Sequence, residues 1–127
     1  MARPHRYSMS DFKKLKVWQK AHDMSLLANT IAKTIRVADE RELRSQLKRS
    51  SASVPANIVE GRAQKSEREF ARFLGYAVAS CSETEYHALS ARDKGLISEA
   101  KWHALTTGVV EVRKMLHGLI DKLNGDK

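Results

Sequence analysis

Residues 43–62 read Leu-Arg-Ser-Gln-Leu-Lys-Arg-Ser-Ser-Ala-Ser-Val-Pro-Ala-Asn-Ile-Val-Glu-Gly-Arg, and this stretch decides the fold. Its apolar residues recur at helical spacing, which predicts an amphipathic helix buried at Leu43, Leu47, Val54 and Ile58. Pro55 lies inside this helix and has no N–H to donate, so we expect a bend there. Gly61 predicts the end of the helix, because glycine is the usual residue of a left-handed C-terminal cap.

Basic side chains of this segment define a candidate nucleic-acid-binding surface. On a helical projection they fall nearly opposite the apolar residues, and the pattern continues into the next helix. The residues are Arg41, Arg44, Lys48, Arg62, Lys65, Arg68 and Arg72. A localised positive field favours a polyanionic partner such as nucleic acid or an acidic protein. The alternative is a solvated surface that Glu42, Glu67 and Glu69 neutralise through pairs along the helices.

Three further helices are predicted, at about residues 12–36, 67–94 and 98–124. Asp39 is the expected N-cap of the second helix, Ser66 begins a capping box with Glu69, and Ser98 caps the last helix. Gly95 and Gly125 end the last two helices. The predicted fold class is all-α, an antiparallel up-down-up-down four-helix bundle. We expect a core that includes Leu15, Trp18, Leu47, Val54, Ile58, Phe70, Leu74, Ala77, Cys81, Leu105, Val109, Val112 and Leu116.

Composition is consistent with one small basic domain. The chain has 127 residues, a net charge of +8 and 42% hydrophobic residues. We expect a flexible basic N-terminal arm at residues 1–11 and a bundle domain at residues 12–124. No apolar run suggests a membrane span or a secretory signal, and the single cysteine permits no internal disulfide, which together predict a cytoplasmic protein.

Residues that could support catalysis have simpler interpretations. There is no phosphate-binding loop, dinucleotide fingerprint or nucleophile elbow. We expect a buried, inert Cys81, serines that bond backbone carbonyls near the bend, a hydrogen-bonded core His22, and an ion pair for Glu85. The Glu83/His87 and Glu99/His103 pairs are expected to be exposed helix pairs. Neither catalytic residues, metal nor cofactor is predicted.

Two features leave alternatives open. Trp18 and Trp102 could stack on bases, but their places in apolar patterns favour core packing. Gly75, Ala79 and Ser82 form a row of small residues on the third helix, which predicts tight packing inside the bundle or, alternatively, a subunit interface.

The chain resembles a bacterial four-helix-bundle protein family that includes proteins encoded in intervening sequences of large-subunit rRNA genes. The resemblance lies in Phe12-Lys-Lys-Leu-Lys-Val-Trp-Gln-Lys-Ala-His22, in residues 43–61, in Ser66-Glu-Arg-Glu-Phe-Ala-Arg-Phe-Leu74 and in the Ser80-to-Leu89 stretch. It implies assembly into a ring, a homopentamer. The same superfamily includes accessory proteins of diversity-generating retroelements, which bind nucleic acid and a reverse transcriptase. The family supplies no catalytic residues.

These observations together predict a non-enzymatic, oligomeric, nucleic-acid-associated module, accessory to a retroelement or to an rRNA intervening sequence. Two alternatives stay open. One is a protein-binding scaffold with no nucleic-acid role, using the groove near Pro55. The other is an enzyme or metalloprotein without a recognisable sequence motif.

Overall fold

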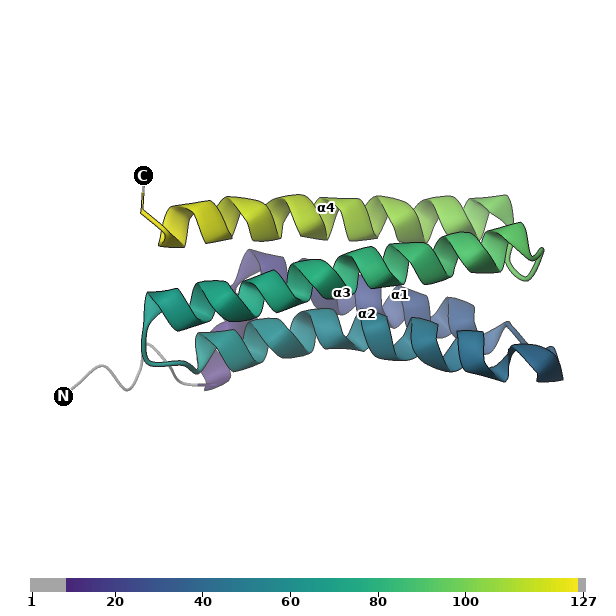
Figure 1. The fold of residues 1–127 in the computed structure, drawn as a ribbon, viewed down its shortest axis with the longest axis horizontal. Coiled ribbons are helices and arrows are strands. Elements are labelled where there is room, and N and C mark those ends of the chain that lie inside the picture. The colour runs from purple at the N-terminus through teal and green to yellow at the C-terminus, as the bar shows by residue number, and fades with distance from the viewer. Residues whose placement is uncertain (1–8, 126–127) are drawn as a thin grey trace.

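The structure is a computed structural model that describes residues 9–125, and within that range it contains four α-helices and no strand. The helices are α1 (Lys16–Lys33), α2 (Arg41–Arg62), α3 (Glu67–Asp93) and α4 (Glu99–Leu123). Short 3-10 helices, η2 (Met9–Lys14) and η3 (Ala38–Glu40), precede α1 and α2. Consecutive α-helices run in opposite directions (Figure 1), which confirms the predicted bundle. Residues 1–8 of the predicted basic arm lie outside the described residues.

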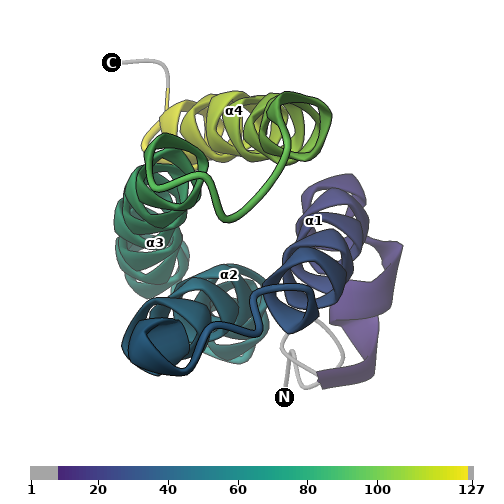
Figure 2. The same cartoon turned by 90° about the vertical axis from the view of Figure 1, so that its right-hand side faces the viewer.

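The core lies along the centre of the bundle. Seen end-on, the helices surround it in sequence order, and α4 packs against α1 as well as α3 (Figure 2). Of the predicted core residues, Leu15 and Trp18 are half-buried and all the others are buried. Burying one large aliphatic side chain contributes about 1.5–3 kcal/mol, so these contacts dominate the stability of the bundle.

The helix ends follow the predicted caps except at the two ends of α2. Ser66 Oγ accepts from the Glu69 N–H at 3.1 Å, and Ser98 Oγ accepts from the Lys101 N–H at 3.1 Å. Gly95 and Gly125 adopt φ values of 74° and 73°, as expected of glycines that end helices. The prediction that Asp39 caps α2 is wrong. That residue lies within η3, and the backbone bond from the Glu40 N–H to the Val37 carbonyl, 3.0 Å long, organises the turn instead.

The second helix continues through Pro55 and past Gly61. Pro55 is buried in the interior of α2, and the helix remains one element across it. The predicted left-handed cap at Gly61 is wrong, since α2 continues to Arg62 and the C-cap, Ala63, is right-handed. Gly61 serves close packing between helices. A Cβ there would lie 2.8 Å from Phe73 Cβ and 2.9 Å from Phe70 Cδ1, so only glycine lets α3 approach this closely.

Four residues with a predicted interior position lie on the surface. His22 is exposed and stacks on Trp18 with 4.8 Å between ring centroids, so the prediction of a core histidine is wrong. Gly75, Ala79 and Ser82 are also exposed, which rules out their packing inside the bundle and leaves the interface alternative. Among the described residues, no helix is both long and apolar enough to span a membrane.

Candidate nucleic-acid interface

The predicted basic residues separate into two clusters at opposite ends of α2. Arg41, Arg44 and Lys48 lie near the start of this helix, whereas Arg62 is its last residue. Lys65, Arg68 and Arg72 follow Arg62 in the connection and the first turns of α3. At 1.5 Å per residue, Lys48 and Arg62 lie about 21 Å apart along the helix. The basic residues therefore do not form one continuous row.

Buried residues on α2 separate the two basic groups. Ser51 and Pro55 follow Lys48 on the same side of the helix, and both are buried. Arg44, Lys48 and Arg62 are half-buried, so the prediction that they lie opposite the core is wrong for them. A helix in a four-helix bundle contacts two neighbours, which widens its buried face and partly covers the positions that flank it.

Two further basic residues, not among the predicted ones, lie beside the basic residues at the start of α2. Lys33, the last residue of α1, and Arg36, in the connection that follows, join Arg44 and Lys48 around a pocket of about 330 Å³ whose remaining lining residue is Ile35. We call these five residues the α1–α2 pocket. Arg44 Nη1 donates a 2.6 Å hydrogen bond to the Ile35 carbonyl oxygen, which fixes the guanidinium against the pocket wall. The sequence signal that could have predicted this site is a short connection between two helices with basic residues on both sides of it.

The second group is more strongly tied to its surroundings. Arg72 makes hydrogen bonds of 2.7 and 3.1 Å to Glu69 Oε1 and one of 2.8 Å to Tyr76 Oη. The hydrogen bond and the charge of Glu69 raise the pKa of Arg72 above its ordinary value. Arg62 lies over the Phe70 ring, 5.9 Å from its centroid. Lys65 and Arg68 are exposed, and Arg62, Lys65, Arg68 and Arg72 together are called the α2–α3 cluster.

Candidate nucleophiles are engaged in packing. Cys81 is buried, as predicted, and burial raises the pKa of its thiol to about 12, which favours the protonated form. Ser50 Oγ and Ser51 Oγ donate to the Leu47 and Lys48 carbonyls at 3.4 and 3.0 Å. These serines bond backbone carbonyls, but not the Ser51 carbonyl that Pro55 leaves without its helical N–H donor, so that part of the prediction is wrong. Ser53 Oγ instead lies 2.8 Å from Ser80 Oγ, so its hydrogen bond joins α2 to α3.

The candidate acidic and histidine residues lie beside partners on the same helix or on a neighbouring one. Arg113 Nη1 lies 2.7 Å from Glu85 Oε1, which confirms the predicted ion pair. His87 is buried, contrary to the prediction of an exposed pair, with Nε2 3.7 Å from Glu83 Oε2. Within residues 9–125, no three histidine, cysteine or acidic side chains are grouped to hold a metal ion.

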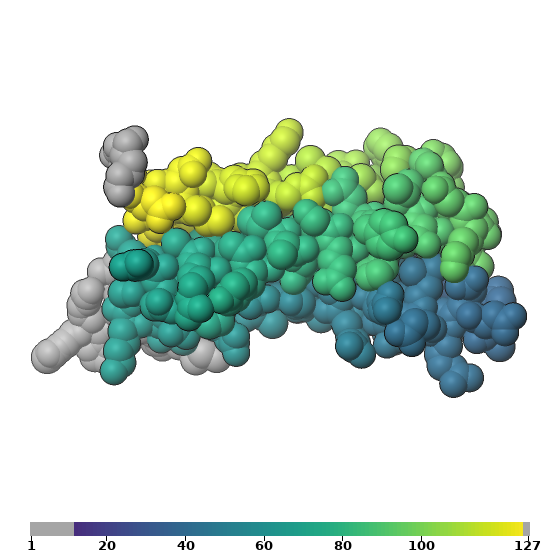
Figure 3. All heavy atoms as spheres, viewed as in Figure 1, coloured from purple at the N-terminus to yellow at the C-terminus, as the bar shows by residue number. Residues whose placement is uncertain are grey.

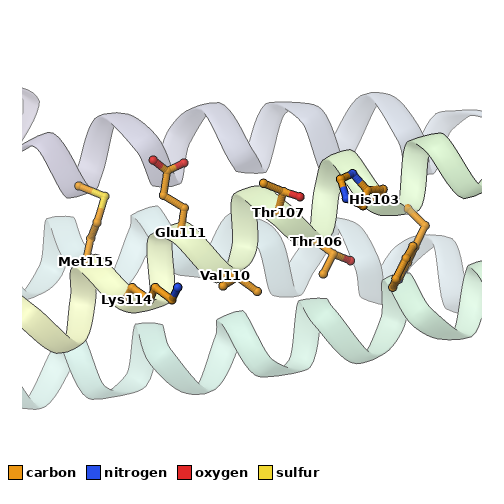
Figure 4. A pocket seen from close by; sticks show the side chains of 8 residues that line it. His103, Thr106, Thr107, Val110, Glu111, Lys114 and Met115 are labelled. Carbon is orange, nitrogen blue, oxygen red and sulfur yellow. The ribbon is translucent and has the colours of Figure 1, made fainter.

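Apolar surface is exposed on α3 and α4. On α3, which lies between α4 and α2 on the face in Figure 3, we define the α3 outer stripe as Gly75, Tyr76, Ala79, Ser82, Tyr86 and Leu89, all exposed. On α4, a groove of about 520 Å³ extends between Trp102 and Met115 (Figure 4). Trp102 is half-buried, with the Arg92 guanidinium 4.3 Å from its ring centroid, so one face of the indole is already covered.

The geometry defines an all-helical bundle with two basic clusters at the ends of one helix. Residues 13–118 match the sequence model of the 23S rRNA-intervening sequence protein family, and the chain belongs to this family. It is similar to a crystal structure of a protein with unknown function from the S23 ribosomal protein family of Bacteroides thetaiotaomicron VPI-5482. The two are 23% identical with a TM-score of 0.75, over 82% of this chain and 97% of that one, a likeness of fold. No curated protein matches the chain.

Proposed function

We propose that the protein is a non-enzymatic, oligomeric module that binds nucleic acid through the sugar-phosphate backbone. The supporting observation is the placement of two basic groups about 21 Å apart along α2. A small anion can contact only one group, whereas a polymer with a phosphate at every nucleotide can contact both. Phosphate contacts position a nucleic acid without reading its bases, so we expect little sequence preference.

Assembly would strengthen this binding. We propose the homopentameric ring that the family resemblance implies, with the α3 outer stripe as part of the subunit contact. Its small residues would let a neighbouring backbone approach, and Tyr76, Tyr86 and Leu89 would supply apolar area. A ring repeats each basic group around its axis, and the combined field attracts a polyanion more strongly than one subunit does.

The exposed apolar surface also supports a second candidate, a scaffold that binds only protein. A reverse transcriptase or another protein could dock on the α3 outer stripe or on the α4 groove. Salt distinguishes the two functions. Apolar docking depends weakly on ionic strength, whereas phosphate binding releases counterions and weakens steeply as salt rises.

The test is fluorescence anisotropy with labelled RNA and DNA oligonucleotides of two unrelated sequences, at about 50 mM salt, where phosphate binding is strong. We expect all of them to bind, with affinities for the two sequences within a few-fold of each other. Absence of binding to every oligonucleotide would refute the proposal. A strong preference for one sequence would refute recognition through the backbone.

A further inference from the structure

We propose that the α1–α2 pocket is the principal phosphate site of this protein and that it seats a backbone phosphate of a nucleic-acid strand. This inference rests on the proposed function and goes further, because it assigns the anchoring contact to Lys33, Arg36, Arg44 and Lys48. Two of these cations lie outside the surface that the sequence indicates. The inference also ranks this pocket above the α2–α3 cluster.

The first argument is the absence of internal counterions. Among residues 9–125, none of the four cations of the pocket forms an ion pair, and no carboxylate lines it. Other basic side chains of the bundle do have acidic partners, such as Lys94 with Glu40 and Lys20 with Glu111. Four like charges around one cavity repel one another, and a bound anion relieves that repulsion.

The second argument is preorganisation. Ile35 is 1% exposed and anchors the pocket wall to the core. Arg44 is held by its bond to the Ile35 carbonyl, and its other guanidinium N–H groups stay available for phosphate oxygens. Lys48 follows one turn later on α2 and is half-buried, which restricts its side chain. Fewer rotamers are lost on binding when the donors are already held in place.

Three carbonyl groups at and just after the end of α1 already accept hydrogen bonds. A helix C-terminus carries a partial negative charge on its free carbonyls. Thr34 Oγ1 donates to the Ile31 carbonyl oxygen at 2.6 Å, and the Ile35 N–H donates to the Ala32 carbonyl oxygen at 3.0 Å. The Ile35 carbonyl oxygen accepts the hydrogen bond from Arg44. Because these oxygens already accept hydrogen bonds, Lys33, Arg36 and Lys48 are not needed as their donors and can bind phosphate oxygens instead.

The α2–α3 cluster lacks these properties. Arg72 gives its strongest hydrogen bonds to Glu69, and a phosphate would have to compete with that carboxylate. Arg62 is turned over the Phe70 ring, and its Nε is buried without a hydrogen-bond partner. Lys65 and Arg68 remain as exposed charges. This cluster therefore serves as a secondary contact, reached by the strand once a phosphate occupies the pocket.

The experiment compares two variants of equal charge change. The pocket variant combines Lys33→Gln, Arg36→Gln and Lys48→Gln, and it keeps Arg44 because that residue bonds the Ile35 carbonyl. The control combines Lys101→Gln, Lys114→Gln and Lys122→Gln on α4, which lies across the bundle from α2 (Figure 2). Circular dichroism verifies that both variants stay helical.

We expect the pocket variant to bind a mixed-sequence oligonucleotide about tenfold more weakly, with the slope of log K against log salt reduced by about 1. The control should lose about twofold at most, because none of its three lysines lines the α1–α2 pocket and salt screens exposed charges that lie away from the bound phosphate. Equal losses in the two variants would overturn the pocket assignment and leave the proposed function standing. Absence of wild-type binding would instead refute the proposed function itself.

A competition experiment distinguishes a backbone phosphate of nucleic acid from free inorganic phosphate as the ligand of the pocket. Inorganic phosphate, which lacks neighbouring phosphates, should displace the oligonucleotide from the wild type only at millimolar concentrations. Displacement at micromolar inorganic phosphate, lost in the pocket variant, would mean that the pocket serves a free anion and would overturn the assignment to a nucleic-acid strand.

Discussion

Replacing Gly61 by alanine tests the close contact between α2 and α3. In an open helical position this change stabilises by about 1 kcal/mol, because glycine is a poor helix former. Here the new methyl group would lie 2.8 Å from Phe73 Cβ and 3.2 Å from the Phe70 carbonyl oxygen, and neither atom can rotate away. Overpacking costs about 1–3 kcal/mol, and we expect the upper value because the helices themselves must separate. The net loss is about 2 kcal/mol.

Urea unfolding at a fixed protein concentration measures this effect. With an m-value of about 2 kcal/mol per M, the midpoint should fall by about 1 M. Gly118→Ala is the matched control, since a Cβ there has nothing within 4 Å, and it should raise the midpoint. Gly61→Asn should lower the midpoint more than Gly61→Ala, because its side chain is larger. If Gly61 were a left-handed cap, asparagine would instead be tolerated better than alanine. An equal gain from Gly61→Ala and Gly118→Ala would refute the packing argument.

Three further changes test other parts of the structure. Phe70→Ala removes a ring that is 5% exposed and should cost about 3–5 kcal/mol in urea unfolding; a loss below 1 kcal/mol would contradict its place in the core. Native Cys81 should resist Ellman's reagent at about pH 8 and react once urea unfolds the chain, because only the thiolate attacks; rapid native labelling would contradict its burial. Light scattering should give a mass several times 14.3 kDa for the wild type and a lower mass for Ala79→Arg, which places a charge on the α3 outer stripe. A wild-type monomer at all concentrations would refute the ring.

The fold is largely predictable from local sequence patterns. Leu47, Val54 and Ile58 recur at helical spacing, and their burial follows because that spacing places them on one face. Ser66 and Ser98 bond backbone groups three residues away, so their caps also depend on local sequence alone. Features of this kind require no knowledge of how the helices pack.

The failed predictions concern residues whose role depends on a neighbouring helix. Gly61 has the sequence signature of a cap, but its function comes from Phe70 and Phe73 on α3. His22 continues the apolar rhythm of its helix but lies where no other helix covers it.

The candidate site is only partly predictable for the same reason. A projection of one helix places Arg44 and Lys48 on a common side, but it cannot show that Lys33 of α1 and Arg36 of the following connection line the same pocket. It also cannot show that Ser51 and Pro55 are covered, which divides the predicted row in two. Both facts depend on the packing of α2 against its neighbouring elements.

The central claim is that the basic surface neutralises the phosphates of a nucleic acid, and the salt dependence of wild-type binding tests it most directly. Anisotropy titrations of one mixed-sequence oligonucleotide between about 50 and 200 mM salt give the slope of log K against log salt. With phosphates in the α1–α2 pocket and on the α2–α3 cluster, we expect a slope of about −2 or steeper, because each neutralised phosphate contributes about −0.7 to −0.9 and assembly multiplies the contacts. Binding with a slope near zero, or no binding at the lowest salt, would contradict the account.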